Sequence, residues 1–95
     1  MVDRIYLFKL VDSATRDEVA ALLQRKLGQV STLAELRVGV PADEASAKSW
    51  DVSCVLSFRD LTDHDAVLAS SIFKTSMDSL APRAAVIKAW SFVQK

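Results

Sequence analysis

The residues that could carry acid–base or metal chemistry are few. The single histidine, His64, lies between two aspartates in the stretch "TDHDA". Imidazole and carboxylate groups can bind a metal ion, and a histidine can transfer protons near neutral pH. Three consecutive residues at the start of a helix, however, point in different directions and do not converge on one ion. We therefore interpret Asp63, His64 and Asp65 as a solvated helix N-terminus, where acidic side chains are favoured, and predict no metal site.

Candidate nucleophiles are poorly supported by their neighbours in the chain. Cys54 is the only cysteine and lies in the apolar stretch "DVSCVLSF", so we expect a buried, inert thiol and no disulfide. Ser70 and Ser71 have no histidine beside them to activate a hydroxyl, and helix capping explains both residues. The two glycines, Gly28 and Gly39, do not form a phosphate-binding loop. These residues predict no catalytic group and no cofactor.

The charge balance and the hydropathy argue against two classes of partner. Twelve Lys and Arg residues balance twelve Asp and Glu residues, which gives a formal net charge of zero at pH 7. A neutral chain without a basic stripe does not attract a phosphate backbone, so no nucleic-acid partner is expected. No apolar run approaches the roughly 18 residues of a membrane span, and no signal peptide is recognisable. We predict a cytoplasmic protein without a membrane partner, in which residues 1–95 form one domain.

The hydrophobic periods predict an alternation of strands and helices. The expected elements, in order, are a strand at 4–10, a helix at 15–28, strands at 33–40 and 50–58, two helical pieces within 61–83, and a strand at 84–93. The stretch "ADEASAKS", between the second and third strands, is expected to be a loop. The order β-α-β-β-α-β is that of the ferredoxin-like split βαβ fold. We therefore predict an α+β protein with a four-stranded antiparallel sheet and its helices on one face.

Capping residues mark the expected helix ends. Thr15 and Glu18 have the spacing of a capping box, in which the threonine oxygen accepts a backbone N–H and the glutamate reaches back. Gly28 is expected to end this helix, because glycine tolerates the left-handed conformation. Thr62 is expected to cap the first piece of the second helical region, and Ser70 or the serine after it the second piece.

The strands are apolar on both faces, although the helices can cover only one. The face expected under the helices carries large side chains: Phe8, Val38, Trp50, Val52, Leu56 and Phe58. The other face mixes aliphatic and polar residues, which suits a homodimer formed sheet against sheet. The candidate interface residues are Ile5, Leu7, Glu35, Arg37, Ser53, Val55 and Ile87. The alternation of the last strand leaves its inward face open, because both of its faces are apolar.

The stretches "RIYLFKL", "SWDVSCVLSF" and "LASSIFKTSM" resemble the stress-responsive A/B barrel domain (Dabb) family, whose members are dimeric α+β barrels. The resemblance implies a homodimer whose two sheets close into a barrel, with a hydrophobic pocket between sheet and helices in each subunit. Most members have no assigned activity, and a few, such as a plant polyketide cyclase, use pocket histidines for acid–base chemistry.

The sequence departs from the family pattern where those histidines stand. Arg4 takes the place of a first-strand histidine, and Val52 that of a third-strand histidine. Ser70 and Phe73 stand where the two histidines of a His-Pro-x-His turn fall, and Ser71 replaces its proline. Groups that titrate near neutral pH are therefore missing from these positions.

The candidate lining of a helix–sheet pocket combines aromatic and polar side chains. These pocket candidates are Arg4, Tyr6, Trp50, Val52, Phe73 and Trp90. They could surround a small apolar ligand, with Arg4 meeting an anionic group at the mouth, or they could form a filled core. We expect a dimeric barrel that is non-catalytic or binds a small apolar ligand. The alternatives are a cofactor-independent enzyme of the cyclase or monooxygenase type and a structural module that binds another protein.

Overall fold

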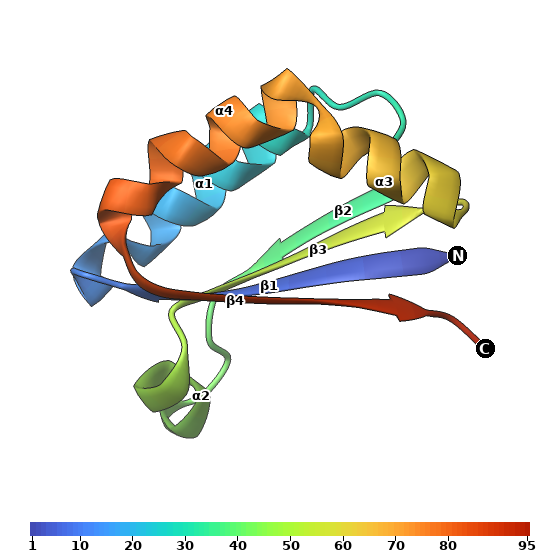
Figure 1. Cartoon of the computed structure of the whole chain (residues 1–95). Coiled ribbons are helices and arrows are strands. Elements are labelled where there is room, and N and C mark those ends of the chain that lie inside the picture. The colour runs from blue at the N-terminus through green and yellow to red at the C-terminus, as the bar shows by residue number, and fades with distance from the viewer.

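The structure is a computed structural model that describes all residues from Met1 to Lys95. Its elements, in chain order, are β1 (Val2–Leu10), a 3-10 turn (Ser13–Thr15), α1 (Arg16–Leu27), β2 (Glu35–Gly39), α2 (Glu44–Ser49), β3 (Val52–Phe58), α3 (Leu61–Ala69), α4 (Ser71–Leu80), a second 3-10 turn (Ala81–Arg83) and β4 (Ala84–Val93). The strands form one antiparallel sheet in the order β2-β3-β1-β4. Helices α1, α3 and α4 cover one face of this sheet (Figure 1). The predicted ferredoxin-like fold is confirmed.

The short helix α2 replaces the loop expected at "ADEASAKS". It lies on the opposite side of the sheet from the other helices, where β2 leads into β3 (Figure 1). The Asp43 carboxylate caps it by accepting a hydrogen bond from the Ser46 amide at 2.8 Å. None of the residues of α2 is buried. Its sequence therefore lacks the periodic apolar residues from which a helix is predicted. As a consequence, Trp50 ends α2 instead of starting β3, and β3 begins at Val52.

The first helix begins after Thr15 and ends at Gly28 as predicted, but its ends are not stabilised in the predicted way. Thr15 is the N-cap of α1, but its side chain makes no capping bond there. Its hydroxyl instead donates to the Asp12 carbonyl oxygen at 2.7 Å, because a 3-10 turn precedes α1 and the Asp12 side chain caps that turn. Gly28 is the C-cap of α1, so the predicted stop is confirmed, but its right-handed φ of −63° shows that the predicted left-handed conformation is wrong.

In the second helical region, one predicted cap is right and one is wrong. The predicted break between two helices is confirmed, and the Ser70 hydroxyl caps α4 by accepting from the Phe73 amide at 3.3 Å. Asp60, not Thr62, caps α3, because its carboxylate accepts from the Asp63 amide at 2.9 Å. A carboxylate at this position also interacts favourably with the positive end of the helix dipole.

The core fills the layer between the helices and the sheet. Its buried members are Tyr6, Phe8, Leu10, Val19, Leu23, Leu27, Val52, Cys54, Leu56, Phe58, Val67, Phe73 and Leu80. Alternate residues of β1 and β3 point into this layer, as the period of a strand requires. Burying each large apolar side chain contributes about 1.5–3 kcal/mol relative to leaving it exposed. Burial also raises the pKa of the Cys54 thiol to about 12, so this side chain stays a neutral thiol at neutral pH.

The register of β4 reverses the expected positions of two candidate residues. Ile87 pairs with Phe8, which lies in the core under the helices, so Ile87 is on the helix side of the sheet. Trp90 pairs with Ile5, so it lies on the face that the helices leave open and is 46% exposed. Ile87 is therefore not on the predicted interface face, and Trp90 does not line a helix–sheet pocket. Because β4 is apolar on both faces, only its pairing with β1 fixes which face is which.

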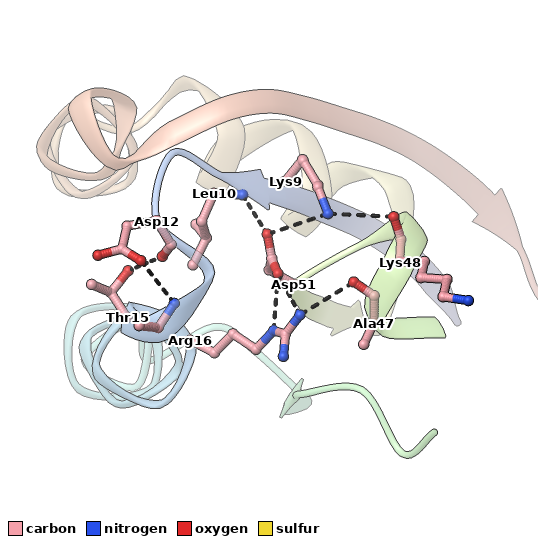
Figure 2. Close-up of polar contacts among 9 residues, drawn as sticks. Lys9, Leu10, Asp12, Thr15, Arg16, Ala47, Lys48 and Asp51 are labelled. Carbon is pink, nitrogen blue, oxygen red and sulfur yellow. Dashed lines mark hydrogen bonds and ion pairs between the residues drawn. The ribbon is translucent and has the colours of Figure 1, made fainter. Parts of the chain in front are cut away.

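A buried carboxylate joins the ends of several elements (Figure 2). Asp51 is fully buried, and its carboxylate accepts a hydrogen bond from the Leu10 amide at 2.7 Å. The Arg16 guanidinium pairs with the same carboxylate at 2.8 Å and also donates to the Ala47 carbonyl oxygen at 3.2 Å. The Lys9 ammonium lies 3.9 Å from the carboxylate. Asp51 thus ties the end of β1 to the start of α1 and, through Arg16, to α2.

The charges and hydrogen bonds around Asp51 keep it ionised. Burial alone would raise the pKa of this carboxyl group. The hydrogen bonds from Leu10 and Arg16 and the positive charges of Lys9 and Arg16 together outweigh burial and hold the pKa below its usual 3.8. A carboxyl group whose pKa is lower in the folded state stabilises the protein above the unfolded-state pKa. That stabilisation is lost as the pH falls through the folded-state pKa.

We expect Asp51→Ala to lower the free energy of unfolding at neutral pH by about 1.5–3 kcal/mol, the range for hydrogen bonds to a charged group. The variant should also lose less stability than the unmodified protein as the pH falls below the usual carboxyl pKa of 3.8, because it has no carboxylate to protonate. Urea unfolding from neutral pH to below this pKa measures both effects. Asp78→Ala, at an exposed residue, is the control and should change stability by less than about 0.5 kcal/mol. Equal stability of the two variants would show that Asp51 does not hold these elements together.

Phe73 tests whether the helix–sheet layer is packed or open. It is 6% exposed, and its ring centroid lies 6.1 Å from that of Tyr6. Phe73→Ala should cost roughly 3–5 kcal/mol of stability, the usual cost of truncating a core phenylalanine. Ile72→Ala on the same helix is the matched control, since Ile72 is 43% exposed, and should cost much less. Similar losses for the two variants would point to an open pocket at Phe73.

Candidate functional site

Five polar and aromatic residues meet on the helix side of the sheet, beside the edge strand β4. We call them the Arg4–His64 cluster: Arg4, Tyr6, His64, Asp65 and Ser91. Arg4 and Tyr6 come from β1, His64 and Asp65 from α3, and Ser91 from β4. The sheet register sets Arg4 directly opposite Ser91, and α3 brings His64 over this pair. Three elements that are distant in sequence therefore build one polar site.

His64 is buried, contrary to the solvated helix start that the sequence suggested. It is 6% exposed, and its ring meets the Phe58 ring edge-on with the centroids 5.4 Å apart. Nδ1 lies 2.8 Å from the Asp65 carboxylate, and Nε2 lies 2.8 Å from the Ser91 hydroxyl. Because a carboxylate only accepts hydrogen bonds, Nδ1 carries the proton of this pair. In the neutral ring, Nε2 then accepts a hydrogen bond from Ser91.

Arg4 lies beside His64 without a carboxylate partner. Its Nε donates to the Tyr6 hydroxyl and its Nη1 to the Ser91 hydroxyl, both at 3.2 Å. The guanidinium carbon lies 5.1 Å from the centroid of the Tyr6 ring, within the range of a cation–π contact. Arg4 is half-buried, whereas Arg25, the other arginine without an ion pair, is exposed. The remaining arginines all pair with acidic side chains: Arg16, Arg37, Arg59 and Arg83. An unpaired, half-buried guanidinium is suited to bind an anion.

The other pocket candidates lie in three different places. Val52 and Phe73 are core residues on the helix side. Trp50 lies beside α2, at a hollow of about 590 Å³ whose lining includes Leu7 and Ser53. Trp90 lies on the open face of the sheet. The structure therefore gathers Arg4, Tyr6, Val52 and Phe73 on the helix side and separates both tryptophans from them.

The open face of the sheet carries the other interface candidates. Ile5, Leu7, Ser53 and Val55 form its half-buried centre. Glu35 and Arg37, on the edge strand β2, are exposed and pair at 3.3 Å. The β4 register adds three exposed apolar side chains that were not among the interface candidates: Val86, Trp90 and Phe92.

Sequence reasoning missed the roles of His64, Asp65 and Ser91 in the cluster. His64 and Val67 are the two buried residues of α3, and their spacing of three marks one helical face. That spacing was the available signal for an inward-facing histidine. Nothing in the chain near Ser91 points to His64, because their contact depends on the register of β4 and the position of α3.

Two further features of the described chain bear on function. No group of three or more His, Cys, Asp or Glu side chains is arranged to hold a metal ion. None of the helices has the length and apolar character needed to cross a membrane.

Comparison with known proteins places the fold and the family. No curated protein matches the chain. A dimeric protein of unknown function from Bacteroides fragilis aligns with a TM-score of 0.77 and 17% identity, over 98% of this chain and 95% of that one. The hydroxynitrile lyase of Passiflora edulis aligns with a TM-score of 0.80 and 13% identity, over 99% and 93%. A Dabb family protein with a ferredoxin-like fold from Mesorhizobium loti aligns with a TM-score of 0.80 and 8% identity, over 99% and 96%. At these identities the structures show a shared fold, whereas the Stress responsive A/B Barrel Domain family matches residues 2–90 directly. The chain belongs to the stress-responsive A/B barrel domain family.

Proposed function

We propose that the protein is a homodimer joined through the open face of its sheet and that each subunit binds a small molecule with an apolar body and an acidic group. The ligand proposal rests on one observation, the half-buried Arg4 guanidinium that has no carboxylate partner. In this proposal residues 1–95 form one domain, and we still predict that the protein is cytoplasmic.

The composition of the open face supports the dimer. Ile5, Leu7 and Val55 are half-buried at its centre, and Trp90 and Phe92 are exposed beside them. Monomeric proteins rarely leave a contiguous apolar patch of this kind in water. An edge strand with exposed apolar side chains, such as β4, also favours association. Structural neighbours from Bacteroides fragilis and Thermobifida fusca are described as dimeric, which agrees with this assembly.

We expect Val55→Asp to dissociate the dimer, because it would place an unpaired charge in an apolar interface. Sedimentation velocity at micromolar concentration should give a dimer for the unmodified protein and a monomer for the variant. Val11→Asp is the control, since Val11 is 71% exposed and lies in the turn after β1. A monomeric unmodified protein, or a Val55→Asp dimer as stable as the control, would contradict the proposed interface.

The surroundings of Arg4 define the class of ligand. The guanidinium can bind a carboxylate through two parallel hydrogen bonds, and the Tyr6 ring beside it is apolar. Ser91, which Arg4 contacts, is exposed, so the cluster reaches the surface beside β4. A small aromatic acid combines the charge and the apolar body that these residues match.

We expect 2-naphthoate to raise the melting temperature of the protein, because a ligand that binds only the folded state stabilises it. Arg4→Gln should abolish this shift by removing the charge. Arg25→Gln is the matched control, because Arg25 is exposed and makes no ion pair, and it should keep the shift. Equal shifts for the two variants, or no shift with the unmodified protein, would count against an acid site at Arg4.

The second candidate function is a cofactor-independent enzyme on the same scaffold. His64 favours it, because this buried imidazole has a hydrogen-bond partner on each nitrogen and can pass a proton between them. The Passiflora edulis neighbour is a hydroxynitrile lyase, so this fold carries an enzyme there. A cyclase or monooxygenase reaction in this chain would use His64 in place of the histidines that the family pattern supplies elsewhere.

A further inference from the structure

Within the Arg4–His64 cluster, Asp65, His64 and Ser91 are linked in series by hydrogen bonds. Binding of an anion by Arg4 would not need this series. The Asp65 carboxylate lies 2.8 Å from His64 Nδ1, and His64 Nε2 lies 2.8 Å from the Ser91 hydroxyl. With the proton on Nδ1, the imidazole accepts the Ser91 proton at Nε2. A base held by a third group and hydrogen-bonded to a hydroxyl is the arrangement that activates a serine as a nucleophile.

The burial of each group fits this role. Ser91 is exposed, so a substrate can reach its hydroxyl. His64 is buried, so its ring is held in place and shielded from water. Arg4 Nη1 donates to the Ser91 hydroxyl at 3.2 Å, so a positive charge lies next to the atom that would attack the ester.

We propose that Ser91 is the nucleophile of an acyl-transfer site that hydrolyses small apolar carboxylic esters. The Ser91 oxygen bonds to the ester carbonyl carbon while its proton moves to His64 Nε2. The carbon–oxygen bond to the leaving alcohol then breaks, and His64 returns the proton to that alcohol. Water attacks the acyl-serine in the same way, which releases the carboxylic acid and restores Ser91. Asp65 is a positioning residue that holds the ring through Nδ1.

The class of substrate follows from the groups around Ser91. Tyr6, whose ring lies under the Arg4 guanidinium, is on the same side of the sheet as Ser91 and is apolar over most of its surface. The acid released by hydrolysis is the class of ligand proposed for Arg4, and this part of the inference rests on the proposed function. The nucleophile itself does not, because it is argued from the geometry of Ser91, His64 and Asp65.

Hydrolysis of p-nitrophenyl butyrate tests the proposal. The unmodified protein should release p-nitrophenolate above the buffer rate, and Ser91→Ala should lower this activity at least about 100-fold, because no acyl-serine can form without the hydroxyl. Ser71→Ala is the matched control, since Ser71 is exposed at the start of α4 and is not one of the cluster residues. Equal rates for Ser91→Ala and the unmodified protein would overturn the proposal.

Three further measurements separate catalysis from folding. A fluorophosphonate probe should label the unmodified protein once, at Ser91, and labelling at any other residue would contradict the assignment. Asp65→Ala should lower kcat with little change in KM, while Asp78→Ala should leave both unchanged. Ser91→Ala should still show the melting shift with 2-naphthoate. A lost shift in Arg4→Gln would therefore report on the binding function, and lost hydrolysis in Ser91→Ala on the nucleophile.

Discussion

The buried carboxylate of Asp51 is the constraint on which the arrangement of elements depends. It holds the end of β1 through the Leu10 amide and the start of α1 through Arg16. Arg16 in turn reaches the Ala47 carbonyl oxygen of α2. A charge this deeply buried is stable only when its surroundings compensate it, so the chain must bring these partners together in order to fold. The network therefore sets the position of α1 on one face of the sheet and of α2 on the other.

At the other end of β1, the same strand supplies the functional candidates. Its pairing with β4 sets Arg4 opposite Ser91, and its pairing with β3 aligns Tyr6 with the core residue Cys54. Helix α3 then contributes His64, whose two nitrogens contact groups on opposite sides of the ring. Because hydrogen-bond donors and acceptors alternate from Asp65 to Arg4, the cluster has a defined direction for proton movement. An isolated polar residue in this layer would only destabilise the core.

The sequence predicts the fold well where one physical signal dominates. The strict alternation of β3, from Val52 to Phe58, predicts which residues enter the core, and the order of periods predicts the ferredoxin-like topology. The prediction of which side chains face the core fails where both faces of a strand are equally apolar. β4 is apolar on both faces, so the positions of Ile87 and Trp90 depend on pairing with β1. Helix α2 has no apolar period, because its residues pack against no core.

The candidate site was less predictable than the fold for a related reason. Arg4 and Tyr6 could be placed near the helices, because the alternation of β1 is fixed by Phe8. His64 looked solvated, because its neighbours in the sequence are acidic and a helix begins there. Its burial follows from the way α3 lies on the sheet, with His64 and Val67 on the inward side. Contacts between segments that are distant in sequence are set by packing, which local patterns do not encode.

The central claim is that α3, β1 and β4 assemble a directed polar cluster around His64. The protonation of its imidazole nitrogens tests this claim most directly, by long-range proton–nitrogen correlation NMR of the neutral ring. The account predicts a single tautomer with the proton on Nδ1, facing Asp65, and a bare Nε2 whose nitrogen shift changes in Ser91→Ala. A proton on Nε2, two tautomers in rapid exchange, or no response to Ser91→Ala would contradict it.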